Sequence, residues 1–388
     1  MPNIALSPRD TATTTYGVTG ERRVVDMADT VALLQPDAAP LLLLTQKLGK
    51  REAINAKFNW QEDELTPSED AINFAAGYDN AAVALVVDNA NYFTKNDIVL
   101  LPATEEIVLV TNVNIGTNTL TVVRGYSDDG KKDAIANNAA LLIIGSAYEE
   151  GAEKQLAPTT KIAVPYNYTE IFRTAFGVTR TLNNSELYGG NQLDYERKKK
   201  GIEHAVKMER SAFFGKRKED LTGTHARRTT GGLLHQYLTE NILAVGGALT
   251  ESKWEDWLRL LFRHGRATRT VFCSSLIISV ISAWARGKLQ TVPKDKTYGI
   301  NVMQYLSPHG IVNLVNHKEV LRGSVYGGYA VGLDLEQIKY RPLRNSDTKL
   351  KTNIQNPSED GEIDEFLTEG GWEIKTPKLH GILTGVTG

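Results

Sequence analysis

"NQLDYERKKKGIEHAVKMERSAFF", residues 191–214, is the stretch that decides the fold. Small and apolar residues recur along it at helical spacing, and most charged residues fall on the opposite side, so the pattern predicts one long amphipathic helix. Gly201 weakens the middle of this helix, and Gly215 suits its C-terminal cap. The predicted apolar stripe consists of Ile202, Ala205, Val206, Ala212 and Phe213.

The same stretch carries a local excess of positive charge. From Glu196 to Lys218 there are nine Lys or Arg residues against three Glu. Such a run permits a weak, sequence-independent attraction to DNA phosphate. The pattern favours a solvated helix face with ion pairs, and His204 is expected on that surface.

Composition restricts the class of protein around this helix. The chain has 388 residues, 41% hydrophobic content and a net charge of −2, which is ordinary for a globular protein of two or three domains. The near-neutral charge argues against a protein built mainly to grip nucleic acid. The single cysteine, Cys273, excludes a disulfide framework within the chain and any multi-cysteine metal site.

No export or membrane segment is expected. The start of the chain lacks the apolar region of a secretory signal. The longest apolar runs, "PLLLLTQ" and "FCSSLIISVISAWA", are too short or too polar to cross a bilayer. We therefore expect a soluble chain with no membrane partner.

The segment before residue 58 is expected to be an arm followed by broken helix and loop. Residues 1–25 show neither helical nor strand period. Asp29 is a plausible N-cap for a short turn. Pro36 and Pro40 are expected to interrupt that turn, and Gly49 to close the segment.

"FNWQEDELTPSED", residues 58–70, combines an aromatic strand with a run of carboxylates. Strand geometry separates Glu62 and Glu64 from Asp63 across two faces, and no His or Cys is near them. A catalytic carboxylate pair is therefore unsupported. The interpretation favoured here is that these acids meet basic groups of another chain.

Two further regions are rich in strand patterns. Between 81 and 147, short β-branched runs separated by Asn, Gly, Asp and Pro predict a small all-β sandwich or barrel. "YNYTEIFRTAFGVTRT", residues 166–181, alternates with period two. Its predicted apolar face consists of Tyr166, Tyr168, Phe172, Phe176 and Val178.

Residues 240–345 predict an α/β region. Thr250 is a plausible N-cap for a helix that presents Trp254, Trp257, Leu258, Leu261 and Phe262 on one face. A strand "RTVFC", a helix "SSLIISVISAWARG" and the strands "INVMQYL", "GIVNLVN" and "QIKYRPL" are expected to follow. An acidic loop then leads to a final strand-like stretch at 371–384.

The motifs of common enzymes are missing. The sequence has no Walker A loop, no G-x-G-x-x-G after a strand and no G-x-S-x-G elbow. Its histidines, including His309 and His317, fit no zinc spacing, and "SEDGEIDEF" lacks the calcium-loop register. Cys273 ends an apolar strand and is expected to be a buried small hydrophobe. We predict no catalytic, cofactor-binding or metal-binding residues, and no enzyme activity.

The order of these pieces resembles a known family. The stretches that carry the resemblance span residues 33–234; they are "LLQPDAAPLLLLTQKLGK", "KFNWQEDEL", "FTKNDIVLLPATEEIVLVTNV" with "LTVVRGY", "YNYTEIFRTAFGVTRT", and "KMERSAFFGKR" followed by "TTGGLL". Together they resemble the major capsid protein of tailed bacteriophages, of the Hong Kong 97 type shared with herpesvirus capsid floors. The chain looks most like a subfamily that carries a β domain inserted in the extended loop called the E-loop.

The resemblance implies an α+β capsid fold with named parts. Residues 191–214 would be its spine helix. The segments would be an N-terminal arm and adjoining loop at 1–57, the E-loop at 58–80 and 150–182, an inserted β domain at 81–149, a peripheral domain at 183–239 and 347–388, and an axial domain at 240–346. The closing strand near 371–384 would return to the peripheral domain.

The resemblance also implies where neighbouring subunits touch. A long two-stranded ribbon is marginal by itself, so a neighbour would have to stabilise its aromatic face. The expected contact residues are Phe58, Trp60, Glu62, Asp63, Tyr166, Tyr168, Phe172 and Arg173. No isopeptide-forming Lys, Asn and Glu set can be identified.

The implied function is a major capsid protein that self-assembles, in the host cytoplasm, into pentamers and hexamers of an icosahedral virion head around double-stranded DNA. The implied partners are other copies of the chain, a separate scaffolding protein, a portal, and DNA by weak non-specific contact, with a decoration protein left as an open alternative. The inserted domain could brace capsomers, bind a decoration protein or project outward.

Three alternatives stay open from the sequence. An encapsulin-like compartment shares the fold. A carbohydrate-binding or adhesion module of a virion tail would use the β-rich segment but would leave residues 191–214 without a role. A hydrolase would use the acids of residues 58–70.

Overall fold

The structure is a computed structural model that describes residues 39–152, 159–185, 191–288 and 302–387. The arm expected before residue 39, with Asp29, lies outside the described residues. The chain divides into two compact units: Gln61–Pro165 forms the smaller one, and the segments on either side of it form the larger one. Each unit is described by itself.

The smaller unit is a six-stranded antiparallel barrel. Its strands are β2 (Glu69–Ala71), β3 (Ala84–Val86), β4 (Asp97–Leu101), β5 (Glu106–Asn114), β6 (Thr119–Val123) and β7 (Ala140–Ser146), in the order β2-β7-β4-β5-β6-β3, with the turn η2 at Ala90–Tyr92. Past β2, Ile72 bridges to Val87. The N–H of Asn73 also donates to the carbonyl of Val86 at 2.9 Å, and these contacts close the sheet.

The strands expected between 81 and 147 are therefore present, and the sheet additionally recruits residues 69–72. Alternate residues of each strand fill the interior, as the period of two requires. The interior includes Ile72, Leu85, Val99, Val108, Val110, Leu120 and Val122, all buried.

The first sheet of the larger unit has six strands in mixed directions. They are β12 (Ile242–Gly247), β13 (Thr268–Cys273), β14 (Val302–Ser307), β15 (Gly310–Asn316), β16 (Ala330–Leu333) and β20 (Gly381–Val386), in the order β12-β20-β16-β13-β15-β14. The helices that accompany it in the chain are α4 (Glu251–Leu261), α5 (Ser275–Lys288) and α6 (Gly323–Tyr326). The expected cap of α4 is confirmed, since Thr250 Oγ1 accepts from Lys253 N at 3.4 Å.

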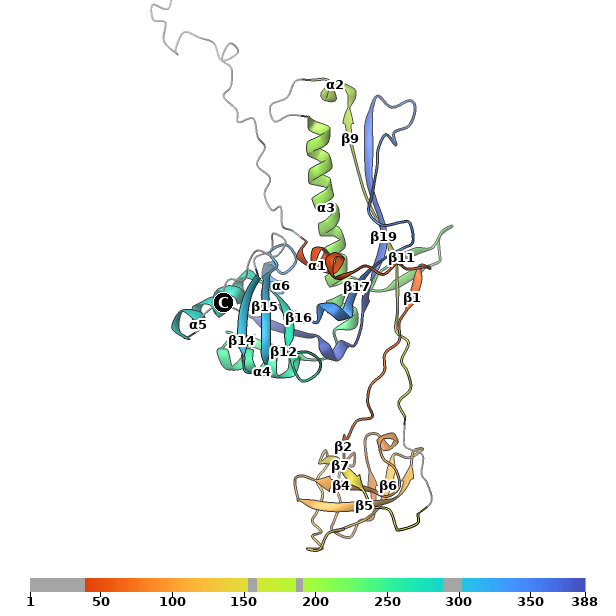
Figure 1. Ribbon diagram of the computed structural model, residues 1–388, viewed down its shortest axis with the longest axis vertical. Coiled ribbons are helices and arrows are strands. Elements are labelled where there is room, and N and C mark those ends of the chain that lie inside the picture. Colours follow the sequence, from red (N-terminus) through yellow and green to blue (C-terminus); the bar gives the residue numbers. More distant parts are fainter. Residues whose placement is uncertain (1–38, 153–158, 186–190, 289–301, 388) are drawn as a thin grey trace, which may run out of the picture. The chain divides into compact units, whose positions relative to one another are not determined.

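The second sheet is built around one long strand, β19 (Gly361–Ile374). It pairs with β9 (Glu170–Thr179), β17 (Ile338–Pro342) and β18 (Lys349–Lys351). The β9 and β19 strands pair antiparallel over their whole common length, from Thr179 opposite Gly361 to Glu170 opposite Gly370. The predicted helix is α3 (Gln192–Phe214), which packs along β9 and β19 (Figure 1).

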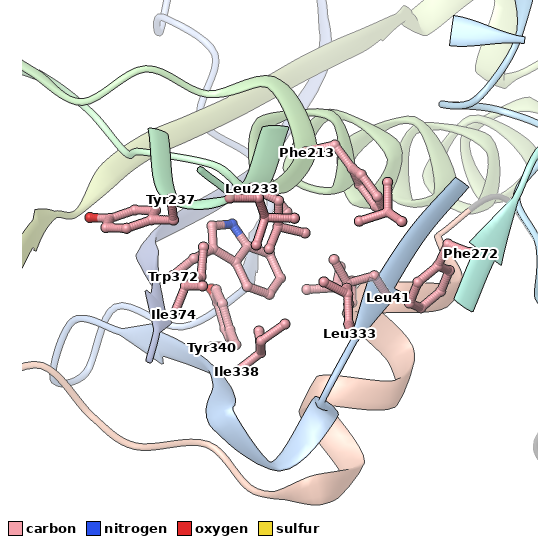
Figure 2. Close-up of a cluster of buried hydrophobic side chains, with 14 of the residues drawn as sticks. Leu41, Phe213, Leu233, Tyr237, Phe272, Leu333, Ile338, Tyr340, Trp372 and Ile374 are labelled. Carbon is pink, nitrogen blue, oxygen red and sulfur yellow. The ribbon is translucent and has the colours of Figure 1, made fainter. Parts of the chain in front are cut away.

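Smaller elements complete the larger unit. They are α1 (Pro40–Leu48), α2 (Arg180–Asn183), the pair β1 (Lys57–Asn59) and β8 (Tyr166–Tyr168), the pair β10 (Lys218–Asp220) and β11 (Arg227–Thr229), a π-helical turn at Leu233–Tyr237, and 3-10 turns at Leu335–Gln337 and Pro377–Leu379. Figure 2 shows the core to which α1, β1 and the π-helical turn contribute, and in which Trp372 of β19 and Tyr340 of β17 pack with ring centroids 5.4 Å apart.

Two expectations about chain breaks are corrected. Pro40 begins α1 rather than interrupting a turn, because a proline at the first helical position gives up an N–H that the helix does not use. The closing stretch at 371–384 is two strands. Thr376 adopts φ of 50° and Pro377 starts a turn, so β19 ends at Ile374 and β20 joins the first sheet.

Candidate intersubunit interface

The aromatic residues expected to face a neighbour are covered by their own chain. In the larger unit β1 pairs antiparallel with β8, with Phe58 opposite Asn167. Phe58 and Trp60 are each 5% exposed, and the Trp60 ring lies 5.7 Å from that of Tyr237. Tyr168 and Phe172 are buried as well. The predicted alternation is confirmed, but the cover over these residues comes from within the subunit.

Asn167 holds β8 against two segments far away in the chain, and no sequence pattern indicates this role. Its side chain is fully buried between strands that are far apart in the chain. The amide Nδ2 donates to the carbonyls of Gly231 at 3.0 Å and Trp372 at 2.7 Å, and Oδ1 accepts from Gly231 N at 2.7 Å. A buried amide with these partners satisfied fixes the register of the segments it joins.

Tyr166 is the half-buried member of the set. Its ring lies between two cations, with Lys57 Nζ 4.1 Å and Arg217 Cζ 3.9 Å from the ring centroid. Arg217 also donates to the Tyr166 carbonyl at 2.6 Å, as does the Tyr237 hydroxyl at 2.8 Å. Cation–π contacts of this kind hold the ring in place while leaving part of it accessible.

Arg173 projects from β9 and makes a two-pronged contact with Glu365 on β19, one hydrogen bond of which measures 3.0 Å. The arginine is largely exposed, whereas Glu365 is buried. The hydrogen bonds from Arg173 lower the pKa of Glu365 against the opposing effect of its burial. Arg173 therefore has a partner within the subunit, and its outer edge faces solvent.

Glu62 and Asp63 belong to the smaller unit, where two chain segments run antiparallel beside each other. Backbone bonds join Glu62 and Ala163 in both directions, at 3.0 and 2.8 Å. Asp63 Oδ1 accepts from Thr160 Oγ1 at 2.7 Å. Asp63 is exposed, so its carboxylate remains accessible from outside. The participation of the eight residues in contacts between subunits stays a prediction.

A second buried polar group was missed by sequence reasoning. Glu209, on α3, is fully buried, and its two carboxylate oxygens accept from the N–H groups of Leu41 at 2.8 Å and Leu42 at 2.7 Å. His317 Nε2 lies 2.8 Å from the same carboxylate. Since Ala39 provides no side-chain cap, Glu209 satisfies the free N–H groups at the start of α1.

His204 is corrected from a surface residue to a buried one. It is 2% exposed, with Nδ1 3.0 Å from Thr174 Oγ1 and Nε2 2.8 Å from Thr368 Oγ1. It borders a cavity of about 400 Å³ between α1 and α3. Burial, with a smaller contribution from Lys207, lowers the pKa of His204 to about 4.

This burial makes stability depend on pH. The unfolded chain binds a proton at His204 below its ordinary pKa of about 6.5, whereas the folded chain does so only near 4. The free energy of unfolding should therefore fall by up to about 3 kcal/mol as the pH drops through this window. We expect His204→Gln to show a shallower decline than the unchanged protein between pH 7 and 4.5 in urea titrations. Equal declines would contradict the assignment.

The remaining sequence expectations concern chemistry. In the described residues there is no grouping of three or more His, Cys, Asp or Glu that could hold a metal ion. No helix among them is both long and apolar enough to cross a membrane. Cys273 is fully buried, and burial raises the pKa of its thiol. Within the basic run, Arg197 contacts Asp364 at 2.7 Å and Lys200 contacts Glu203 at 2.7 Å, as expected of an ion-paired helix face.

Comparison with known proteins assigns nearly the whole chain to one family. A family model described as SU10 major capsid protein matches residues 10–387. The major capsid protein of Pseudomonas phage PaMx41 is 24% identical over 413 residues, covering 99% of this chain and 95% of that protein. A solved structure described as the capsid of a native GTA particle covers 97% of this chain and 100% of its own, with a TM-score of 0.51 and 8% identity, which is a likeness of fold.

These matches agree with the α+β architecture described above, which is that of tailed-phage major capsid proteins. The family match extends over nearly all of the chain rather than over one of its two units. The chain therefore belongs to the SU10 major capsid protein family and forms the shell of a phage virion.

Proposed function

We propose that this chain builds an icosahedral head from pentamers and hexamers in the manner of the Hong Kong 97 type. The observation that carries the proposal is the long helix α3 packed along the β9–β19 ribbon, while the chain between β1 and β8 forms a compact unit of its own. In this assignment α3 is the spine helix, and the role of the protein is structural rather than catalytic.

The proposed parts follow the fold with two adjustments. The E-loop and its inserted β domain would correspond to residues 61–165. The expected second leg, 150–182, is shortened because β9 at Glu170–Thr179 is part of the sheet around β19. The axial domain would be the six-stranded sheet with α4 and α5, and it would include β20 from the end of the chain. The peripheral domain would hold α3 and the second sheet.

Assembly can be tested directly. We expect negative-stain electron microscopy of the purified chain, alone or co-expressed with candidate scaffolding proteins, to show closed shells or rings of five and six subunits. Many weak contacts act together in such a particle, so assembly should be steeply dependent on protein concentration. Small discrete oligomers under every condition would contradict the proposal.

The exposed acids of the proposed E-loop give a sharper test. We expect Asp63→Lys to leave the free energy of unfolding of the subunit within about 1 kcal/mol of the parent, because Asp63 is exposed and its hydrogen bond from Thr160 lies at the surface. The yield of shells should fall severalfold, since the new lysine would repel the basic groups that Asp63 is proposed to meet on the neighbouring chain. This repulsion recurs at every subunit. Asp128→Lys makes the same charge change at another exposed acid of the smaller unit and serves as the control. Equal yields from both variants would remove Asp63 from the proposed contact.

A further inference from the structure

The basic run of the sequence divides into two parts in the structure. On α3 its arginines are neutralised by acids of the same chain. Arg197 contacts Asp364 at 2.7 Å, and Arg210 contacts Glu319 at 3.5 Å. Past the end of α3 the run enters the β10–β11 hairpin, where most of the cations lack such a contact. The hairpin is therefore the part of the run that is left to meet a partner.

The cations of the hairpin meet Lys57 of β1 around one aromatic ring. Lys57 Nζ lies 4.1 Å and Arg217 Cζ lies 3.9 Å from the centroid of the Tyr166 ring. Lys216 and Lys218 flank Arg217 in the chain, and Lys218 begins β10. We call this surface the basic hairpin patch; it consists of Lys57, Lys216, Arg217, Lys218 and Arg227.

The patch holds positive charge that its own chain does not offset. None of its five cations forms an ion pair with a described residue, and all but Arg217 are exposed. Residues 216–229 contain two acids. Glu219 pairs with Arg228 at 2.7 Å, and Asp220 lies opposite Arg227 on the adjacent strand. A surface with this excess of cations attracts a negatively charged partner.

Charge is divided unequally between the two units of the chain. The smaller unit, residues 61–165, contains sixteen Asp or Glu and six Lys or Arg, a net charge of −10. The larger unit contains 30 acidic and 38 basic residues, a net charge of +8. The near-neutral total thus combines one strongly acidic unit with one basic unit. Opposite potentials of this kind steer two surfaces together and determine which surfaces meet.

Negative charge is concentrated in one segment of the smaller unit. Residues 61–94 contain seven Asp or Glu and no Lys or Arg. The acids lie within residues 62–88, which we call the acidic strip. Asp63 and Asp88 are exposed, and neither forms an ion pair in the part of the chain that the structure describes. Burial, and then the charge of Asp88, raises the pKa of Asp70, and only hydrogen bonds oppose this rise. A cationic partner would relieve this crowding of like charges.

A second copy of the chain is the partner that these charges select. Each copy brings one acidic strip and one basic hairpin patch, so the two surfaces are present in equal numbers. DNA phosphate is another anion that a basic surface attracts, but Glu219 and Asp220 within the hairpin would repel it. Because the strip and the patch are different surfaces, their contact is head-to-tail. Head-to-tail contacts that close produce rings, as pentamers and hexamers require.

We propose that the acidic strip of one copy docks on the basic hairpin patch of the next copy, head-to-tail around each ring. This inference rests on the proposed assembly into pentamers and hexamers, and it names the two surfaces that join neighbouring subunits. Tyr166 and Arg217 belong to the residue types that contribute most to protein–protein binding. Because the contact is ionic, rising salt concentration should weaken it.

Charge reversal on either surface tests the contact. The hairpin-reversed chain carries Lys216→Glu and Lys218→Glu, and the strip-reversed chain carries Asp63→Lys and Asp88→Lys. We expect each chain alone to give at least tenfold fewer shells or rings than the parent, measured by sedimentation and negative-stain electron microscopy. Far-ultraviolet circular dichroism of the subunits establishes that both chains are folded.

A matched control reverses two lysines outside the patch. Lys318 and Lys349 are exposed residues of the larger unit. Lys318→Glu combined with Lys349→Glu makes the same change in net charge as the hairpin-reversed chain. We expect this control to assemble with a yield near that of the parent.

Co-expression of the two reversed chains tests whether the contact joins different copies. When the two chains alternate in a ring of six, every negative hairpin meets a positive strip and every positive hairpin meets a negative strip. We therefore expect mixed rings that contain both chains, although neither chain assembles alone. A contact within one chain, or with another molecule, would not be restored by mixing.

Several results would overturn the inference. They are a normal yield from the hairpin-reversed chain, an equal loss in the lysine control, and failure of the two folded chains to assemble together. Shells that form normally from the hairpin-reversed chain but retain less DNA would assign the patch to DNA instead. Absence of shells and rings from the unchanged chain would overturn the proposed assembly itself.

Discussion

Glu209→Ala is expected to lower the free energy of unfolding of the larger unit by about 3–5 kcal/mol, because a buried carboxylate that serves several hydrogen-bonding groups is removed. The variant leaves the N–H groups of Leu41 and Leu42 without their acceptors at the start of α1, and it leaves His317 without its carboxylate. Each unsatisfied buried group adds to the loss. Urea titration of the soluble subunit, followed by tryptophan fluorescence, measures the change.

Two further variants on the same helix separate this effect from a general one. Glu203→Ala removes an exposed carboxylate that pairs with Lys200, so we expect a change of at most about 0.5 kcal/mol. Glu209→Gln keeps one carbonyl acceptor and should lose less than the alanine variant. If Glu203→Ala and Glu209→Ala destabilised the subunit equally, the capping role of Glu209 would be refuted.

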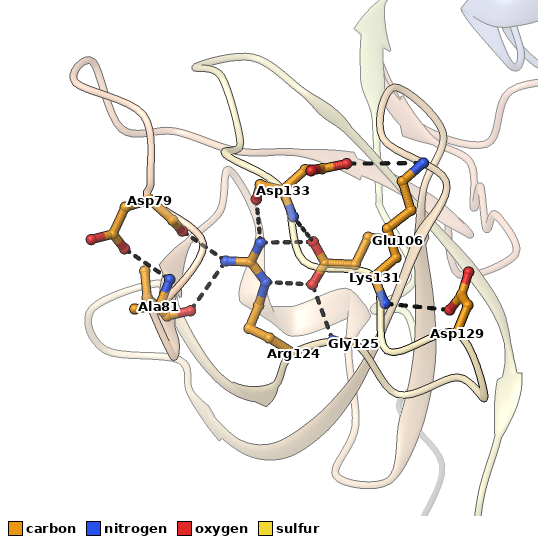
Figure 3. Close-up of polar contacts among 9 residues, drawn as sticks. Asp79, Ala81, Glu106, Arg124, Gly125, Asp129, Lys131 and Asp133 are labelled. Carbon is orange, nitrogen blue, oxygen red and sulfur yellow. Dashed lines mark hydrogen bonds and ion pairs between the residues drawn. The ribbon is translucent and has the colours of Figure 1, made fainter.

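Arg124→Ala is expected to cause a loss of similar size, about 3–5 kcal/mol, in the smaller unit. Arg124 and Glu106 are both buried and form two parallel hydrogen bonds of 2.6 and 2.7 Å (Figure 3). The guanidinium also donates to the carbonyls of Asp79 at 3.0 Å and Asp133 at 2.5 Å. Burial alone would raise the pKa of Glu106, but the hydrogen bonds that it accepts from Arg124 and from the N–H groups of Asp133 and Gly125 outweigh burial and lower that pKa.

A surface ion pair in the same loops provides the matched control. Lys131 contacts Glu105 at 3.7 Å on the exposed side of the barrel, so Lys131→Ala should change stability by less than about 1 kcal/mol. Limited proteolysis shows which unit of each variant unfolds first, because the first cleavage sites lie in the unfolded segment. We expect the first cuts in Arg124→Ala to fall between residues 61 and 165, with the larger unit still protected. Early cuts distributed evenly over the whole chain would contradict an independent role for this pair.

Local pattern was enough to predict much of the fold. The helix at 191–214, the cap at Thr250 and the short strands between 81 and 147 depend on neighbours within a few residues, and the structure has each of them. The order of these elements also carried the resemblance to tailed-phage capsid proteins. Periodicity worked here because burial on one side imposes it on the sequence.

The misses have a common physical cause, which is contact between residues far apart in the chain. His204 and Glu209 sit among charged neighbours on α3, and burial of both comes from segments more than 100 residues away or across the sheet. The sequence left a sandwich and a barrel open, and the pairing of Ile72 with Val87, which no local pattern marks, decides for the barrel. Trp60 was expected to be covered by a neighbouring subunit, because Tyr237, which covers it within its own chain, lies in a distant turn.

The barrel strands β4 and β5 show a further limit of pattern. Alternation distinguishes the two faces of a strand when one is apolar and the other polar. In "DIVLL" and "EIVLV" both faces are apolar, so the sequence predicts strands but not which side is covered. The register between strands was needed to show which of these residues lie opposite one another.

The position of β20 has a consequence for how the subunit is made. This strand, Gly381–Val386, lies between β12 and β16, so the edge strand β12 has no neighbour in the six-stranded sheet until residues 381–386 are in place. A chain that already contains β12 and β16 still lacks the strand that joins them. Completion of this sheet therefore requires the pairing of strands that lie far apart in the chain, which is slower than the pairing of neighbouring strands.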